Sequence, residues 1–189
     1  MDNARDRELP YAWVIVALAF FALATAMGIR STIGLLVSPW EAEFGWDRAA
    51  VSLTASFGFL AYGLAQPIAG RWADRYGPRL VFTGSLGLLG LSTIGVGVIQ
   101  NLWQAYLVFG IGLMAAVGGA SNVPAAVAIV RWIKRRKALA VGIVMAGAAA
   151  GQLVLVPAIA AFIKASGWRA AFVWSGLAVL LIAVPLVGF

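Results

Sequence analysis

Apolar residues fill long, nearly continuous blocks of this 189-residue chain, and short clusters of charged and turn-forming residues separate the blocks. Each block holds about 20 residues or more, the length that a helix needs to cross the hydrocarbon core of a bilayer. The blocks lack the period-two alternation of barrel strands, and backbone groups in lipid must form their hydrogen bonds internally. The pattern therefore predicts an all-α, polytopic membrane protein.

Cutting the chain at these clusters divides it into a polar tail, residues 1–10, and a transmembrane bundle, residues 11–189. Six transmembrane helices are expected at residues 11–37, 49–70, 80–99, 103–130, 138–163 and 170–189. The first apolar run is far longer than the core of a signal peptide, so we expect no cleaved signal.

Composition narrows the classes of function. With 62% hydrophobic and 11% charged residues, the chain is unlike a soluble domain, of which about 25% is charged. The absence of Cys and His excludes disulfides, Cys/His metal sites and a Ser-His-Asp triad. Asp74 is the only acidic residue outside the N-terminal tail and the outer loop, so the sequence offers no pair of carboxylates for acid–base catalysis. We expect no enzyme activity, no metal and no cofactor.

The basic residues predict an orientation. Ten Lys and Arg residues lie in the tail and in the second and fourth connections, against Arg48, Lys164 and Arg169 on the opposite side. The positive-inside rule therefore places the N-terminus in the cytoplasm, with the bundle in the inner or plasma membrane of the cell. Topology also explains the basic run at residues 131–137, so nucleic acid is not an expected partner. Six spans that start inside should end at a basic cytoplasmic segment, and residues 180–189 are apolar, so we expect a second half to be missing.

The second connection carries a motif. Its key residues are Gly70, Asp74, Arg75, Gly77 and Arg79. This motif resembles the G-x-x-x-D-R-x-G-[RK]-[RK] signature between spans two and three of major facilitator superfamily transporters, with Pro78 in place of one basic residue. The resemblance implies that the six spans form one half of the fold, built from nested inverted 3+3 repeats, and that the motif gates the cytoplasmic side by bridging the two halves. A basic turn that only follows the topology would leave Asp74 unexplained.

A narrower resemblance covers the fourth connection and fifth span. The basic triplet and small-residue pattern of monocarboxylate porters is matched by Arg135, Arg136, Lys137, Leu139, Ala140, Gly142, Ala146 and Gly147. Ile133 and Val144 depart from it. This resemblance implies alternating-access transport of a small organic anion, a monocarboxylate or dicarboxylate, by proton symport or anion exchange. The span-five pattern of drug/proton antiporters is missing, which disfavours that branch. The alternative is a half-length membrane protein without transport, either an assembly partner or a truncated remnant.

Arg30 is the one full charge inside a predicted span. At 1.5 Å per residue it lies about 28 Å from Tyr11 and about 10 Å from Val37. Its guanidinium either snorkels to the outer interface or faces an aqueous cavity, where it can bind a carboxylate in a bidentate fork. The position resembles the first-span basic residue of monocarboxylate porters, which favours the second interpretation. Arg scarcely deprotonates, so its role in proton handling is doubtful.

Three uncharged polar residues join Arg30 as candidate substrate contacts: Tyr62, Asn122 and Gln152. Hydrogen bonds between helices are the competing explanation for each of them. The Gly147 and Gly151 pair is expected to serve helix packing. Tryptophans near the span ends, including Trp40 and Trp168, are expected to anchor in the headgroup layer.

Overall fold

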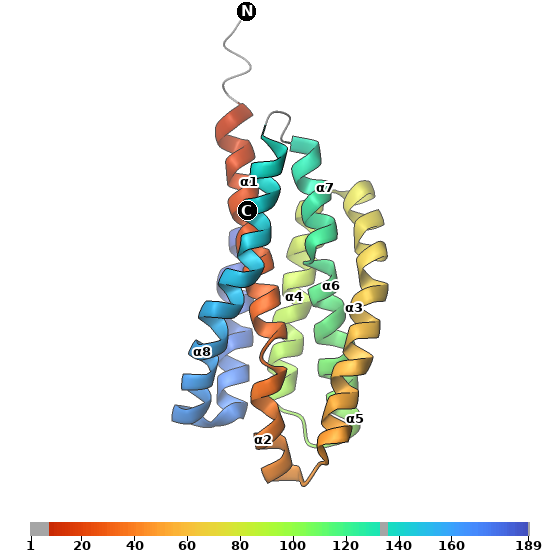
Figure 1. Ribbon diagram of the computed structural model, residues 1–189, viewed down its shortest axis with the longest axis vertical. Helices are drawn as coiled ribbons and strands as arrows, with labels where there is room; N and C mark the ends of the chain where they lie inside the picture. The colour runs from red at the N-terminus through yellow and green to blue at the C-terminus, as the bar shows by residue number, and fades with distance from the viewer. Residues whose placement is uncertain (1–7, 133–135, 189) are drawn as a thin grey trace, which may run out of the picture.

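The computed structural model describes residues 8–132 and 136–188, and its regular structure there is entirely helical, which confirms the all-α prediction (Figure 1). In chain order the elements are α1 (Glu8–Arg30), α2 (Ile33–Phe44), α3 (Arg48–Tyr76), α4 (Pro78–Gly97), α5 (Leu102–Ala105), η1 (Tyr106–Leu113), α6 (Met114–Gly119), α7 (Asn122–Trp132), α8 (Lys137–Ala178), η2 (Val179–Ala183) and α9 (Val184–Gly188). The long helices pack side by side along one axis, as expected of a polytopic membrane protein.

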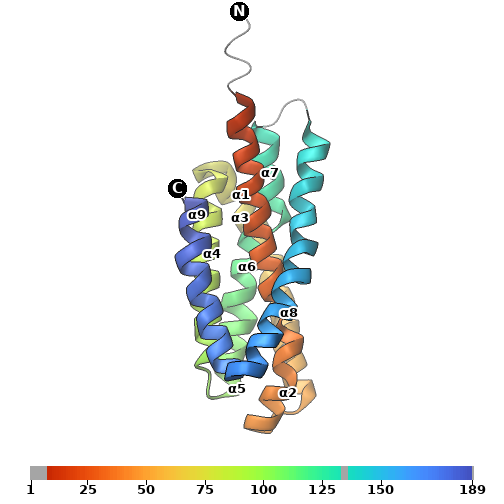
Figure 2. The same cartoon turned by 90° about the vertical axis from the view of Figure 1, so that its left-hand side faces the viewer.

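Helix α8 is interrupted at Gly167. This glycine has φ 83° and ψ 159°, a conformation open to glycine and closed to residues with a Cβ. There the chain reverses direction, and the part after Gly167 runs back along the bundle next to α4 (Figure 2). The apolar stretch of residues 137–188 is thus two antiparallel legs, and four further apolar helical stretches cover residues 13–44, 48–76, 78–97 and 102–126. Which residues of these helices lie in lipid stays a prediction.

The first and fourth apolar stretches are each broken inside their length. Between α1 and α2, the hydroxyl of Thr32 donates to the carbonyl oxygen of Ile29 at 2.6 Å, and that of Ser31 donates to the carbonyl oxygen of Met27 at 2.9 Å. These side chains bond locally where the helical ladder is interrupted. Between α6 and α7, Ala120 and Ser121 leave the helical conformation. Both breaks lie well away from the ends of the bundle.

Helices α1 and α8 pack at the distance that glycine allows. A Cβ on Gly147 would lie 2.7 Å from the carbonyl oxygen of Phe20, and one on Gly151 would lie 2.6 Å from the Cα of Ala24. A Cβ on Gly28 would meet the carbonyl oxygen of Gly151 at 2.8 Å. The glycine pair therefore brings two backbones together, as its spacing predicts.

An aromatic cluster closes the end of the bundle at which α2 lies. Trp40 is fully buried there, with ring centroids 5.6 Å from Trp46, 6.4 Å from Phe109 and 6.3 Å from Trp168. Trp168 is itself buried. The expectation that Trp40 and Trp168 anchor in the headgroup layer is wrong, because neither ring can reach lipid headgroups from inside the cluster. Trp103, in contrast, is 75% exposed.

Candidate functional site

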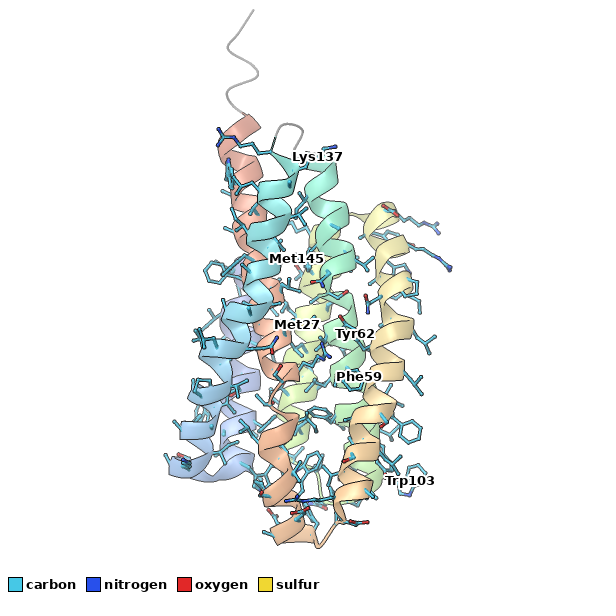
Figure 3. All side chains as sticks on the ribbon, viewed as in Figure 1. Met27, Phe59, Tyr62, Trp103, Lys137 and Met145 are labelled. Atoms are coloured by element: carbon cyan, nitrogen blue, oxygen red, sulfur yellow. The ribbon has the colours of Figure 1, made fainter. Side chains whose placement is uncertain are left out.

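Arg30 is the last residue of α1, directly before the first break, and its guanidinium extends toward α3. Its Cζ lies 5.1 Å from the ring centroid of Phe59 and 5.0 Å from that of Tyr62. Its Nη1 contacts the sulfur of Met27 at 3.5 Å. Figure 3 shows Met27, Phe59 and Tyr62 at one level of the bundle, where α1 and α3 face each other. A cation over aromatic faces is attracted by the ring quadrupoles, so the structure stabilises this charge without a carboxylate.

The surroundings of Arg30 leave its N–H groups free to bind an anion. In the part of the chain that the structure describes, no oxygen atom accepts a hydrogen bond from Arg30. The negative end of the α1 helix dipole lies beside this residue and favours a cation. A guanidinium carries five N–H donors, and a thioether is a weak acceptor. The half-buried Arg30 therefore has donors ready for an anionic ligand.

Asn122 makes no contact with Arg30 among the described residues. Gly118 of α6 packs against the backbone of Tyr62, since a Cβ there would lie 2.8 Å from its carbonyl oxygen. Asn122 follows Gly118 by four residues, about one helical turn, and is exposed at the start of α7. The structure thus brings Arg30 and Tyr62 together, whereas Asn122 lies further along the bundle, next to Val123, which packs against Gly70 of α3.

Gln152 stands apart from this group. Its Nε2 donates to the carbonyl oxygen of Ala148 at 3.3 Å, one turn earlier on α8, and its side chain is exposed. The residues that sequence reasoning missed are Phe59 and Met27. Phe59 and Tyr62 are spaced i, i+3 on α3 and so share a helix face, a signal that could have identified Phe59.

The two helix breaks add an independent pointer to this region. In a half built from two inverted three-helix repeats, the first and fourth spans are equivalent, and discontinuous helices at equivalent positions form binding sites near the midplane. The first break follows Arg30, and the second, at Ala120 and Ser121, precedes Asn122. Ser121 is fully buried, and its hydroxyl has no hydrogen-bond partner among the described residues.

The motif of the second connection forms a tight turn between α3 and α4. Gly77 has φ 91° and ψ 148°, and its N–H donates to the carbonyl oxygen of Ala73 at 3.1 Å; Pro78 then starts α4. Gly70 is buried, and a Cβ there would lie 3.2 Å from Cγ1 of Val123 on α7. The remaining motif residues, Asp74, Arg75 and Arg79, lie at this end of the bundle and are exposed. The gating role of the motif stays a prediction.

The basic run that follows α7 is described only in part. Arg136 and Lys137 are exposed at the start of α8, whereas residues 133–135, including Arg135, lie outside the described residues.

A second charged cluster, which sequence reasoning did not identify, lies at the end of the bundle opposite the motif. Arg169 donates to Oε1 of Glu43 from Nη2 at 2.8 Å and from Nε at 3.1 Å. Its Nη1 donates to the carbonyl oxygens of Gly97, the last residue of α4, and of Ile99, two residues further on. The indole N–H of Trp168 donates to the other oxygen of Glu43 at 2.7 Å. This cluster links α2, α4 and the second leg of α8.

Comparison with known proteins places this geometry in a family. The family model of the Major Facilitator Superfamily matches residues 17–189. The oxalate:formate antiporter of Oxalobacter formigenes is 29% identical over 180 residues, 94% of this chain and 42% of the relative. Monocarboxylate transporter 11 is 31% identical in Homo sapiens, over 88% of this chain and 35% of the relative, and 28% identical in Mus musculus, over 90% and 38%. The chain spans about two fifths of the length of these relatives.

Proposed function

This chain belongs to the major facilitator superfamily, and on that premise we propose that it forms one six-helix half of a secondary transporter for a small organic anion. In this proposal a second half, from further sequence or from another chain, completes the transport unit, and the two halves alternate access to a site between them. The greater length of the relatives supports a two-half unit. The integral membrane character agrees with the long apolar helices.

The observation that carries the proposal is the placement of Arg30. A charged residue inside a membrane span is energetically costly and generally faces a cavity or a partner. The groups that lie over the Arg30 guanidinium are the aromatic rings of Phe59 and Tyr62, and neither carries a negative charge. A carboxylate substrate would supply the missing counter-charge through two parallel N–H···O bonds. Tyr62 and Asn122 are proposed as further substrate contacts, and Gln152 as a contact reached only in another conformation of the transporter.

The proposed substrate class is a monocarboxylate or a dicarboxylate. The bidentate fork of a guanidinium fits a planar carboxylate better than a spherical halide. Two of the relatives are named for monocarboxylates and one for oxalate and formate, which supports this class. Arginine side chains in proteins scarcely deprotonate, so anion exchange would need no further group, whereas proton symport would need a titrating group elsewhere.

Substitution of Arg30 tests the proposal. Proteoliposomes containing the protein as its gene encodes it should take up labelled oxalate or lactate, and Arg30→Gln should abolish uptake because the counter-charge is lost. Arg30→Lys should retain partial uptake with a raised KM, since an ammonium keeps the charge and loses the fork. Arg48→Gln, at an arginine whose side chain is 76% exposed, is the control and should transport normally. Unchanged KM and rate in Arg30→Gln would place the anion site elsewhere.

The orientation proposed for the unit has the N-terminus and the α3–α4 turn in the cytoplasm, in the inner or plasma membrane of the cell. This rests on the excess of basic residues on that side. The motif residues Gly70, Asp74, Arg75, Gly77 and Arg79 then lie where a cytoplasmic gate between the two halves would form.

A further inference from the structure

We infer that Phe59 and Tyr62 hold the Arg30 guanidinium in a fixed orientation, and that these two rings, beyond the charge itself, give the site its preference for planar over spherical anions. The inference rests on the proposed function and deepens it. It assigns Phe59 as a positioning residue that acts on the substrate through Arg30.

Three side chains surround the end of the Arg30 side chain. Phe59 and Tyr62 are three residues apart on α3 and therefore project from one face of that helix. Their ring centroids lie at nearly equal distances, 5.1 Å and 5.0 Å, from the same Cζ atom of Arg30. Met27, one turn before Arg30 on α1, contacts Nη1 from another side. Three side chains thus localise the end of a long side chain that would otherwise sample many rotamers.

The rings of Phe59 and Tyr62 also leave N–H groups of Arg30 free for a ligand. An ion-pair partner for Arg30 would occupy the same N–H groups that a substrate carboxylate needs, and the substrate would have to displace it. A ring face attracts the cation through its quadrupole and accepts no conventional hydrogen bond along the N–H fork. Phe59 and Tyr62 therefore stabilise the charge and leave its donors available to a ligand.

The orientation of the Arg30 guanidinium affects which anions it binds best. A mobile guanidinium attracts any anion by charge, and a spherical halide gains nearly as much as a carboxylate. A guanidinium whose plane is already fixed makes two parallel hydrogen bonds to a planar carboxylate without first losing rotamer freedom. The advantage of planar anions over halides should therefore fall when the rings are removed, even though the charge remains.

Exposure supports a role for Phe59 outside the core. Its side chain is 53% exposed, so its removal leaves little cavity. Phe21 on α1 has a matching exposure of 52% and contacts Phe20, with no recorded contact to Arg30. Phe21→Leu is therefore a matched control for the loss of one half-exposed phenylalanine.

The experiment measures competition in proteoliposomes that contain the protein as its gene encodes it. Uptake of labelled oxalate is inhibited with formate, a planar carboxylate, and with bromide, a sphere, and the ratio of their inhibition constants is the readout. Phe59→Leu and Tyr62→Leu should each reduce the preference for formate about three- to tenfold, the size of one cation–π contact. Phe59→Trp and Tyr62→Phe keep a ring and should restore it. Phe21→Leu should leave the ratio unchanged.

The outcomes separate this inference from the function on which it rests. If Arg30→Gln abolishes uptake while Phe59→Leu and Tyr62→Leu keep the natural formate-to-bromide ratio, the orienting role is wrong and the anion site stands. If Arg30→Gln transports normally, the anion site itself is wrong. Should Phe59→Leu fail to give monodisperse protein, the comparison of Tyr62→Leu with Tyr62→Phe decides, because both keep Phe59. A loss in Tyr62→Phe equal to that in Tyr62→Leu would assign the effect to the phenol hydroxyl and overturn the ring mechanism.

Discussion

At the scale of single residues, the packing of α1 against α8 depends on Gly151. A Cβ at this position would lie 2.6 Å from the Cα of Ala24, and backbone atoms cannot move aside as a flexible side chain can. We expect Gly151→Ala to destabilise the protein by at least about 2 kcal/mol, as overpacking in a tight interface does. The measurement is the thermal unfolding midpoint of the purified protein in lipid nanodiscs.

Gly142, on the same helix, provides the matched control. Among the described residues, no atom outside the neighbouring helix backbone lies within 4 Å of a Cβ built there. Gly142→Ala should be neutral or should stabilise by up to about 1 kcal/mol, because alanine loses less backbone entropy in a helix. Equal midpoints for the two variants would show that the α1–α8 interface is looser than the structure indicates.

At the scale of elements, the sequence predicted the helices and missed the breaks inside the first and fourth of them. Lipid leaves the backbone no alternative to internal hydrogen bonding, so length and apolarity alone identify the spans. The reversal at Gly167 falls inside an expected connection. The break after Arg30 carries neither Gly nor Pro, and Ser31 and Thr32 can occur inside helices. The contacts of Arg30 with α3 depend on tertiary packing, and the residues around the break do not predict them.

The turn between α3 and α4 supplies the prediction at this scale. Asp74 lies in the last turn of α3, where the negative end of the helix dipole disfavours an acid. If the proposed gate forms, we expect Asp74→Asn to lower the transport rate about tenfold, the effect of losing one charge-assisted hydrogen bond of the kind proposed between the halves. Transport kinetics in proteoliposomes measure it, with Arg71→Gln, an exposed neighbour outside the motif, as control. A change confined to KM would assign Asp74 to the substrate site.

At the scale of the whole molecule, the contacts that sequence reasoning missed are those between distant residues. Glu43 and Trp168 are 125 positions apart in the chain, yet they share a hydrogen bond. Trp40 is a residue type that is common at membrane interfaces, near a predicted span end. Its burial depends on the rings of Trp46, Phe109 and Trp168, which lie outside α2. Local patterns specify which segments cross the membrane; they do not specify which side chains meet at the ends of the bundle. The candidate site shows the same division, since Arg30 stood out as a lone charge and Phe59 did not.

The cluster around Arg169 joins α2, α4 and α8 at one end of the bundle, as the proposed rocking of one half against another would require. Its guanidinium bonds both to Glu43 of α2 and to the carbonyl oxygens of Gly97 and Ile99, which would otherwise be unsatisfied at a helix end. We expect Arg169→Gln to lower the unfolding midpoint of the protein, since the bonds to Glu43 and to both carbonyl oxygens are lost together. Unfolding midpoints in nanodiscs measure the change.

The ion pair between Arg48 and Glu41, at the same end of the bundle, provides the comparison for the change in midpoint expected of Arg169→Gln. Arg48 bonds to Glu41 at 2.9 Å, but its side chain is 76% exposed, and pairs of this kind contribute about 0–1 kcal/mol. Arg48→Gln should therefore shift the midpoint far less than Arg169→Gln, although each variant removes one positive charge from the same end. Because the two differ in the helix-end carbonyls that only Arg169 reaches, a similar small shift in both would mean that these carbonyls are satisfied by water or lipid. In the proposed transporter, this end of the half would then be held together by the buried aromatic cluster around Trp40.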